Sequence, residues 1–291
     1  MTSMQKNALH TSHERSFATN RFVYPVLSRR SQGVSIGINL NPDKVCNFDC
    51  VYCQVDRTTT SETRFVELDQ LLLELDHMLA LVASGELFKT EQFQGVPESL
   101  QRLNDIAFSG DGEPTTYRNF DEIIGACAEL KQRHGLAAVK MVLITNASMF
   151  HRKHVQRGLE ILDANQGEIW AKLDAGTDEY FHLIERTSIP FQRVLDNIQR
   201  AARLRPLVIQ SLFMKVNDES PSDVELEAFC DRLNQVTTNG GAISLVQVYT
   251  IARRPAESYV TPLADHEVDR IVELVSLRTD IQVVGYYGYS T

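Results

Sequence analysis

The chain has 291 residues, of which 43% are hydrophobic, so it can bury a sizeable core in one large domain or two small ones. Its 29 basic and 38 acidic residues leave a net charge of −9, which opposes a broad electrostatic grip on nucleic acid. No apolar leader follows the N-terminus, and acidic side chains interrupt the longest apolar stretch, residues 71–82. We therefore expect a cytoplasmic protein that neither is secreted nor spans a membrane.

Residues 1–22 are polar and show neither helical nor strand periodicity, so we predict a flexible N-terminal arm. From there to residue 260, short β-branched or apolar runs alternate with longer amphipathic ones. This alternation is typical of α/β proteins, in which helices return the chain to successive parallel strands. The predicted strands lie at 33–40, 105–109, 140–146, 168–175, 207–214 and 243–251.

Helical patterns separate these strands at 68–82, 120–134, 191–204 and 222–236. The segment 84–104 has mixed signals and is either a loop or an inserted short helix. In the C-terminal part, 261–291, a helix at 264–277 leads to a run at 281–287 that could add a closing or edge strand. We expect this part to pack on the main domain, 23–260.

Three of the five cysteines, Cys46, Cys50 and Cys53, fall in the octapeptide CNFDCVYC directly after the first predicted strand. A loop at the carboxyl end of a strand is where α/β folds place their functional sites. The cytosol keeps thiols reduced and the number of cysteines is odd, which argues against a disulfide framework. The spacing therefore favours a metal or iron–sulfur site.

The set of three ligands is itself informative. Structural zinc sites are closed by four protein ligands, whereas three ligands leave one position open for a small molecule. The other two cysteines, Cys127 and Cys230, share apolar helical faces and are expected to be ordinary buried thiols. The alternatives are a zinc site completed by a distant His or Asp, and an electron-transfer cluster completed by Cys127 or Cys230.

Polar residues follow the second and third predicted strands. In SGDGEP, the glycines Gly110 and Gly112 permit close backbone approach, and Asp111 and Glu113 supply carboxylates. Such a segment is commonly only a turn, but here it lies one βα unit after the cysteine loop. Asn146, at the end of the third strand, could hydrogen-bond a ligand or cap a turn.

Two pairs of charged residues stand near the carboxyl ends of later strands. Lys172 and Asp174 share one face of the strand at 168–175, so both side chains should point inward, away from the face that packs against helices. They are either site residues or a structural ion pair, because burying a charge is costly and is found where the charge is paired or functional. Arg253 and Arg254 follow the sixth strand and are either a clamp for a substrate carboxylate or phosphate, or solvated side chains.

The octapeptide resembles the signature of radical S-adenosylmethionine (radical SAM) enzymes, with Tyr52 as the aromatic residue before the third cysteine. The resemblance implies a partial (βα)6 TIM-like barrel and a [4Fe–4S] cluster on the three cysteines, with S-adenosylmethionine chelating the fourth iron. It further implies cleavage of S-adenosylmethionine to a 5′-deoxyadenosyl radical, with an external one-electron donor of flavodoxin or ferredoxin type. Tyr52 would lie near the adenine, or else fill the base of its own loop. SGDGEP resembles the family's GEP-type motif, whose acid engages the amino group of S-adenosylmethionine.

Over about residues 24–260 the chain is similar to the wyosine-synthetase-like iron–sulfur oxidoreductases. Wyosine synthetases modify tRNA and carry a second cluster on three cysteines upstream of the signature. This chain has no cysteine before Cys46, which together with the charge of −9 argues against tRNA as the substrate. The alternatives from other classes are a non-catalytic zinc or electron-transfer protein and a barrel that binds a nucleotide without catalysis.

Overall fold

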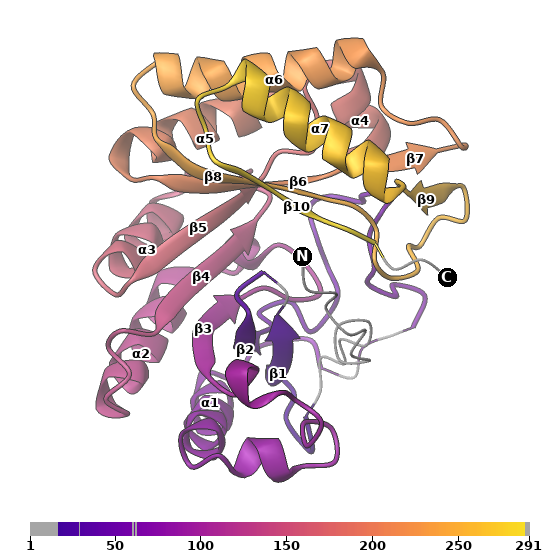
Figure 1. The fold of residues 1–291 in the computed structure, drawn as a ribbon. Coiled ribbons are helices and arrows are strands. Elements are labelled where there is room, and N and C mark those ends of the chain that lie inside the picture. Colours follow the sequence, from indigo (N-terminus) through magenta and orange to yellow (C-terminus); the bar gives the residue numbers. More distant parts are fainter. Residues whose placement is uncertain (1–16, 29, 60, 62, 289–291) are drawn as a thin grey trace. The chain divides into compact units, whose positions relative to one another are not determined.

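The structure is a computed structural model that describes residues 17–28, 30–59, 61 and 63–288 (Figure 1). Most of the arm predicted at 1–22 lies outside the described residues. The chain divides into two compact units. The first comprises Met1–Val45, Thr60–Leu143 and His154–Glu168, and the second comprises Cys46–Thr59, Ile144–Lys153 and Ile169–Thr291.

The first unit is built on parallel strands with one antiparallel strand at the edge. Strand β2 (Gly33–Ile38) pairs in parallel with β3 (Leu103–Phe108), which pairs in parallel with β4 (Lys140–Thr145). Strand β1 (Val23–Ser28) runs antiparallel to β2. Strand β1 was not predicted from the sequence. Its Pro25 lacks a backbone N–H donor and is tolerated because the strand lies at an edge.

Helices α1 (Leu68–Ala83), α2 (Phe120–Arg133) and α3 (Lys153–Asp163) belong mainly to this unit. The buried carboxylate of Glu74 in α1 accepts the backbone N–H groups of Arg21, Phe22 and Val23, which fixes the chain where it enters β1. The undecided segment 84–104 forms two short 3-10 turns, η2 (Glu86–Lys89) and η3 (Glu98–Leu100). A third, η4 (Pro114–Thr116), precedes α2.

The second unit holds the strands β5 (Gly167–Lys172), β6 (Leu207–Leu212), β8 (Ile243–Tyr249) and β10 (Val283–Tyr286), parallel and in that order. Helices α4 (Asp178–Glu185), α5 (Phe191–Leu204), α6 (Asp223–Thr238) and α7 (Asp265–Arg278) connect them or follow them. A small antiparallel pair, β7 (Met214–Val216) and β9 (Val260–Pro262), lies outside this sheet. Helix α7 packs on β8 and β10.

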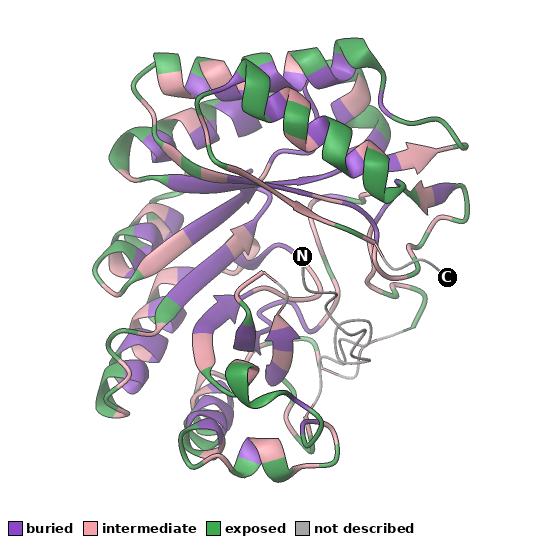
Figure 2. Cartoon of the chain, viewed as in Figure 1, coloured by how far each residue is buried: buried purple, intermediate pink, exposed green. Residues whose placement is uncertain are grey.

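Burial follows the pattern expected for strands covered on both faces. Every residue of β2 and of β6 is buried, whereas the helices alternate buried and exposed faces (Figure 2). The predicted helices at 68–82, 120–134, 191–204, 222–236 and 264–277 are confirmed within one or two residues, and the run at 281–287 contains β10. Among the described residues, none of the helices combines the length and the apolar character that crossing a bilayer requires.

Candidate functional site

The cysteine loop, residues 46–59, belongs to the second unit. Cys46, Cys50 and Cys53 are half-buried free thiols, and the N–H of Cys53 donates to the carbonyl of Cys50 at 3.0 Å to close a turn. The N–H groups of Asp49 and Val51 donate to carbonyls of the last residues of α4, at 3.1 and 2.8 Å. The loop thus rests on the carboxyl end of a helix, although it has no regular structure of its own.

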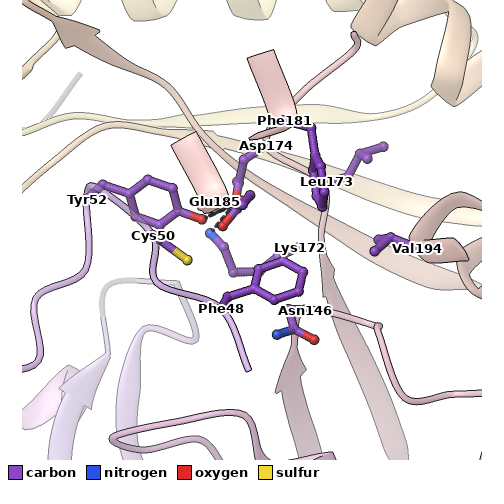
Figure 3. A pocket seen from close by; sticks show the side chains of 10 residues that line it. All are labelled: Phe48, Cys50, Tyr52, Asn146, Lys172, Leu173, Asp174, Phe181, Glu185 and Val194. Atoms are coloured by element: carbon purple, nitrogen blue, oxygen red, sulfur yellow. Dashed lines mark hydrogen bonds and ion pairs between the residues drawn. The ribbon is translucent and has the colours of Figure 1, made fainter. Parts of the chain in front are cut away.

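Tyr52 anchors the loop in a buried polar cluster (Figure 3). Its hydroxyl lies 2.5 Å from Oδ2 of Asp174 and 2.8 Å from Oε1 of Glu185. A phenol has one proton, so two such short contacts require that one of the two carboxyls be protonated. Burial, and then the charge of Asp174, raise the pKa of Glu185, which makes Glu185 the protonated partner.

Lys172, at the end of β5, supplies the positive charge of this cluster. Its ammonium lies 3.0 Å from Oδ2 of Asp174 and donates to the hydroxyl of Tyr249 at 2.7 Å. It also lies 5.0 Å from the centre of the Tyr52 ring and 5.1 Å from that of Tyr249, within range of a cation–π contact. Burial is the largest single influence and lowers the pKa of Lys172, but Asp174, Tyr249 and Glu185 together outweigh burial and raise it.

A pocket opens between this cluster and a set of apolar side chains (Figure 3). The charged and polar groups stand on one part of its wall and hydrophobic groups on another, which is typical of small-molecule sites. Its lining comprises Phe48, Cys50, Tyr52, Asn146, Lys172, Leu173, Asp174, Phe181, Glu185 and Val194. The structure therefore brings Cys50, Tyr52, Asn146, Lys172 and Asp174 together, and all five were candidates from the sequence.

Asn146 connects the end of β4 to the cysteine loop. Its side-chain oxygen accepts from the N–H of Ser148 at 3.0 Å, which caps a local turn. Its Nδ2 donates at 2.9 Å to Oδ1 of Asn47, and Nδ2 of Asn47 donates at 2.7 Å to the hydroxyl of Ser148. Asn146 therefore caps a turn, which was one of its two predicted roles. It also lines the pocket.

The donor set of the loop is chemically suited to an iron–sulfur cluster, because three thiols lie within eight residues on a backbone free of regular structure. No three His, Cys, Asp or Glu side chains among the described residues converge on one point as a formed metal site would require. The thiols share a loop without a common centre, and metal binding commonly supplies the energy that draws such ligands together. The suitability of the loop for an iron–sulfur cluster thus rests on the type of its three donor atoms and on their spacing along the chain.

The other two cysteines have a different environment. Cys127 in α2 and Cys230 in α6 are buried, as predicted. Burial raises the pKa of Cys127, and it raises that of Cys230 to about 11, so both remain protonated and inert at neutral pH. Burial, and then the carboxyl of Glu185, also raise the pKa of Cys50.

The segment SGDGEP lies in the first unit and is described there by itself. Asn39 holds it, since its Oδ1 accepts from the N–H of Asp111 at 3.1 Å and its Nδ2 donates to the carboxylate of Asp111 at 2.6 Å. A Cβ at Gly110 would lie 2.1 Å from Oδ1 of Asn39, and one at Gly112 would lie 2.2 Å from the carbonyl oxygen of Val45. Both glycines are therefore required by close approach rather than by their dihedral angles.

Glu113 is buried at the start of η4. Its Oε1 accepts from the N–H of Thr115 at 3.1 Å and from the hydroxyl of Thr115 at 2.5 Å. The side chain thus caps the turn that follows it.

Arg253 and Arg254 lie in the loop after β8, and neither lines the pocket. The backbone of that loop follows the cysteine loop: Nε2 of Gln54 donates to the carbonyl of Arg253 at 3.4 Å, and the N–H of Ala256 donates to the carbonyl of Cys53 at 2.9 Å. The Arg254 side chain is exposed and that of Arg253 is half-buried.

Sequence reasoning missed Glu185 and Phe48, which line the pocket, and Tyr249, whose hydroxyl accepts from Lys172. Glu185 ends α4, a helix of eight residues that was not predicted. A signal was present, because Thr177 caps the helix by accepting from the N–H of Tyr180 and acidic residues fill the first turn. The inward position of Glu185 depends on packing and has no local signature.

Comparisons with known proteins give the chain a family context. A family model described as the radical SAM superfamily matches residues 40–228. A GTPase Obg of Brachyspira hyodysenteriae is 25% identical over 91% of this chain, which spans only 35% of that protein's length. A UPF0026 protein of Helicobacter pylori is 25% identical over 84% of this chain and 70% of its own length, and one of Methanocaldococcus jannaschii is 24% identical over 86% and 69%.

Solved structures share the fold. A radical SAM methyltransferase from Sphaerobacter thermophilus matches 91% of this chain and 69% of its own, with a TM-score of 0.62 and 13% identity. SuiB of Streptococcus suis bound to S-adenosylmethionine matches 89% of this chain and 52% of its own, with a TM-score of 0.59 and 14% identity. TYW1 with a lysine–pyruvate adduct matches 85% and 74%, with a TM-score of 0.50 and 12% identity. The expected α/β fold, a partial TIM-like barrel with mostly parallel strands, is confirmed.

Proposed function

Because this chain belongs to the radical SAM superfamily, we propose that Cys46, Cys50 and Cys53 hold a [4Fe–4S] cluster with which the protein cleaves S-adenosylmethionine reductively. The observation that carries the proposal is the cysteine loop itself, whose second thiol lines a pocket of buried charged groups. When bound, the reduced cluster supplies one electron to S-adenosylmethionine, which splits into methionine and a 5′-deoxyadenosyl radical that takes a hydrogen atom from the substrate.

The pocket's own residues would hold the reactants and exclude water. Phe48, Phe181 and Val194 give it an apolar wall, and the rings of Phe48 and Phe181 meet edge to face at 5.8 Å. A wall of this kind protects a radical from solvent and from competing hydrogen donors. Tyr52 is held by its hydroxyl, so its ring presents a fixed face beside Cys50.

Lys172 and Asp174 are proposed as the substrate-side residues. An ammonium has three N–H donors, of which Asp174 and Tyr249 take two. The third can donate to an acceptor on the substrate, and the fixed position of Asp174 sets its direction. Arg253 and Arg254 belong to the same proposal as contacts at the loop after β8, where the backbone accompanies the cysteine loop.

The segment from Gly110 to Glu113 is proposed to bind the amino group of S-adenosylmethionine. The support is its resemblance to the GEP-type motif, together with the absence of side-chain bulk at both glycines and the acidic groups beside them. The electron would come from an external one-electron donor of flavodoxin or ferredoxin type.

The test is anaerobic reconstitution of the full chain with iron and sulfide, followed by reduction with dithionite in the presence of S-adenosylmethionine. We expect a brown protein that releases 5′-deoxyadenosine and methionine, with no release when either dithionite or S-adenosylmethionine is omitted. A colourless protein that holds one zinc ion would contradict the proposal. A brown protein that binds S-adenosylmethionine without cleaving it after reduction would contradict the catalytic part.

A further inference from the structure

Arg57 reaches back from the end of the cysteine loop to its third cysteine. One guanidinium nitrogen, Nη2, lies 3.7 Å from the sulfur of Cys53, within hydrogen-bonding distance for sulfur. The other, Nη1, donates at 3.1 Å to the carbonyl of Phe48 and at 3.3 Å to Oδ1 of Asp49. The planar guanidinium thus bridges the middle of the loop and the thiol at its end.

The side chain of Arg57 is held in place rather than solvated, since 28% of it is exposed. Its Nε atom is buried and has no hydrogen-bond partner among the described residues. A buried donor without an acceptor is costly, and in native proteins such a donor is commonly satisfied by an ordered water or a bound group. The Nε–H group of Arg57 is therefore a second available donor, in addition to the Nη2 group that points at Cys53.

The charge of Arg57 is one end of a chain of ion pairs. Oδ1 of Asp49 faces Arg57 at 3.3 Å, and Oδ2 faces Arg186 at 3.0 Å. Arg186 continues to Glu257 at 2.5 Å and donates through Nε to the carbonyl of Asp49 at 2.7 Å. The two carboxylates and two guanidiniums alternate, and the cationic end of the chain is the one that contacts the sulfur.

We propose that Arg57 is a positioning residue that donates a hydrogen bond to the sulfur of Cys53 and thereby raises the reduction potential of the cluster. This inference rests on the proposed function, because it requires Cys53 to be a ligand. Reduction adds one negative charge to a cluster on three thiolates, and a cation that donates to a ligand sulfur stabilises the more negative state. Arg57 thus makes reduction of the cluster by the external donor easier, and it makes the reduced cluster a correspondingly weaker electron donor to S-adenosylmethionine.

The experiment is a redox titration of the reconstituted protein, monitored by the electron paramagnetic resonance signal of the reduced cluster. Arg57→Gln removes the charge and is expected to lower the equilibrium constant for reduction about tenfold, which for a one-electron couple is about 59 mV towards more negative potential. Arg57→Lys keeps the charge but cannot span the same acceptors, so we expect a smaller shift of the same sign. Iron and sulfide are measured first in every variant.

The matched control is Arg186→Gln, which removes the other cation on Asp49. Arg186 contacts oxygen atoms of Asp49 and Glu257. We expect the potential of this variant to equal that of the wild-type protein. An equal shift in both glutamine variants would show that loop anchoring, not the contact with sulfur, sets the potential, and would overturn the inference. A wild-type potential in Arg57→Gln would also overturn the inference. If Arg57→Gln binds no iron, a wild-type potential in Arg57→Lys would overturn it instead. Failure of the wild-type protein to bind a cluster would instead contradict the proposed function.

Discussion

The cysteine loop and the SGDGEP segment are both irregular, but they are held in opposite ways. The SGDGEP segment is held by the hydrogen bonds of Asn39 and by close backbone packing, since at Gly110 and Gly112 the space for a Cβ is already occupied by Asn39 and Val45. The cysteine loop is fixed from outside, by Tyr52 in a buried charged cluster and by Arg186 on its exposed side. A loop whose thiols must rearrange around a cluster gains from anchors at its edges, because they leave the ligands themselves able to move.

The largest expected effect separates the cysteines of the loop from those of the helices. Cys50→Ala should abolish cluster assembly and leave the fold intact, because the thiol is half-buried and belongs to an irregular loop. Cys230→Ala is the matched control and should keep the wild-type iron content, with only the modest loss of stability that a small core truncation causes. Iron and acid-labile sulfide after reconstitution, with circular dichroism for the fold, provide the readout. Wild-type iron in Cys50→Ala would contradict the assignment.

The next effect tests the buried anchor of the cysteine loop. Lys172→Met leaves Asp174 buried without its cation, and breaking one side of a buried pair costs about 3–5 kcal/mol of the free energy of unfolding. Lys140→Met removes the exposed pair with Glu168 and should cost less than about 1 kcal/mol. Urea denaturation of the two variants makes the comparison. Equal losses would show that the Lys172 pair does not behave as a buried one.

A smaller effect tests the close approach in the SGDGEP segment. Gly112→Ala places a Cβ 2.2 Å from the carbonyl oxygen of Val45, so the backbone must shift, at about 1–3 kcal/mol. Gly125→Ala, in the middle of α2, has its closest contact at 3.8 Å and should instead stabilise the protein by up to about 1 kcal/mol. Thermal unfolding of both variants measures the difference. A neutral Gly112→Ala would mean that close approach does not hold this segment.

The smallest effect concerns the exposed anchor of the cysteine loop. Arg186→Gln should change the global free energy of unfolding by less than about 1 kcal/mol, because the pairs of Arg186 are partly exposed. It should nevertheless speed amide hydrogen exchange at Asp49 and Val51, whose N–H groups donate to α4. Arg270→Gln removes another exposed pair, with Asp223, and should leave exchange in the loop unchanged. Unchanged exchange in Arg186→Gln would show that backbone contacts alone hold the loop.

The sequence allowed the strands and the longer helices to be predicted because their patterns are local. The strand at 207–214 is apolar apart from Gln210 and Ser211, and α5 carries a regular apolar stripe over Phe191–Leu204. Strand β1 was missed because Pro25 interrupts its pattern, and α4 was missed because it is only eight residues long. In both β1 and α4 the local sequence pattern is too weak to distinguish a regular element from a loop.

The candidate site could be predicted where it depends on spacing along the chain and not where it depends on packing. The three cysteines and the pairing of Lys172 with Asp174 follow from spacings of four, three and two residues. Glu185 lies 133 residues from Tyr52 along the chain, and Tyr249 lies 77 residues from Lys172, so only the folding of the chain brings each pair together. Arg57 is near Cys53 in sequence, but the direction of its side chain depends on the contacts with Phe48 and Asp49.

The proposed reaction requires that three thiolates of one loop leave an iron atom of the cluster open to S-adenosylmethionine. The most direct measurement is the electron paramagnetic resonance spectrum of the reduced, reconstituted protein with and without S-adenosylmethionine. If S-adenosylmethionine binds at an open iron, the spectrum should change when it is added. The spectrum should not change when adenosine is added, because adenosine lacks the methionine group. An identical spectrum at saturating S-adenosylmethionine would mean that a fourth protein ligand completes the cluster, and it would contradict the account.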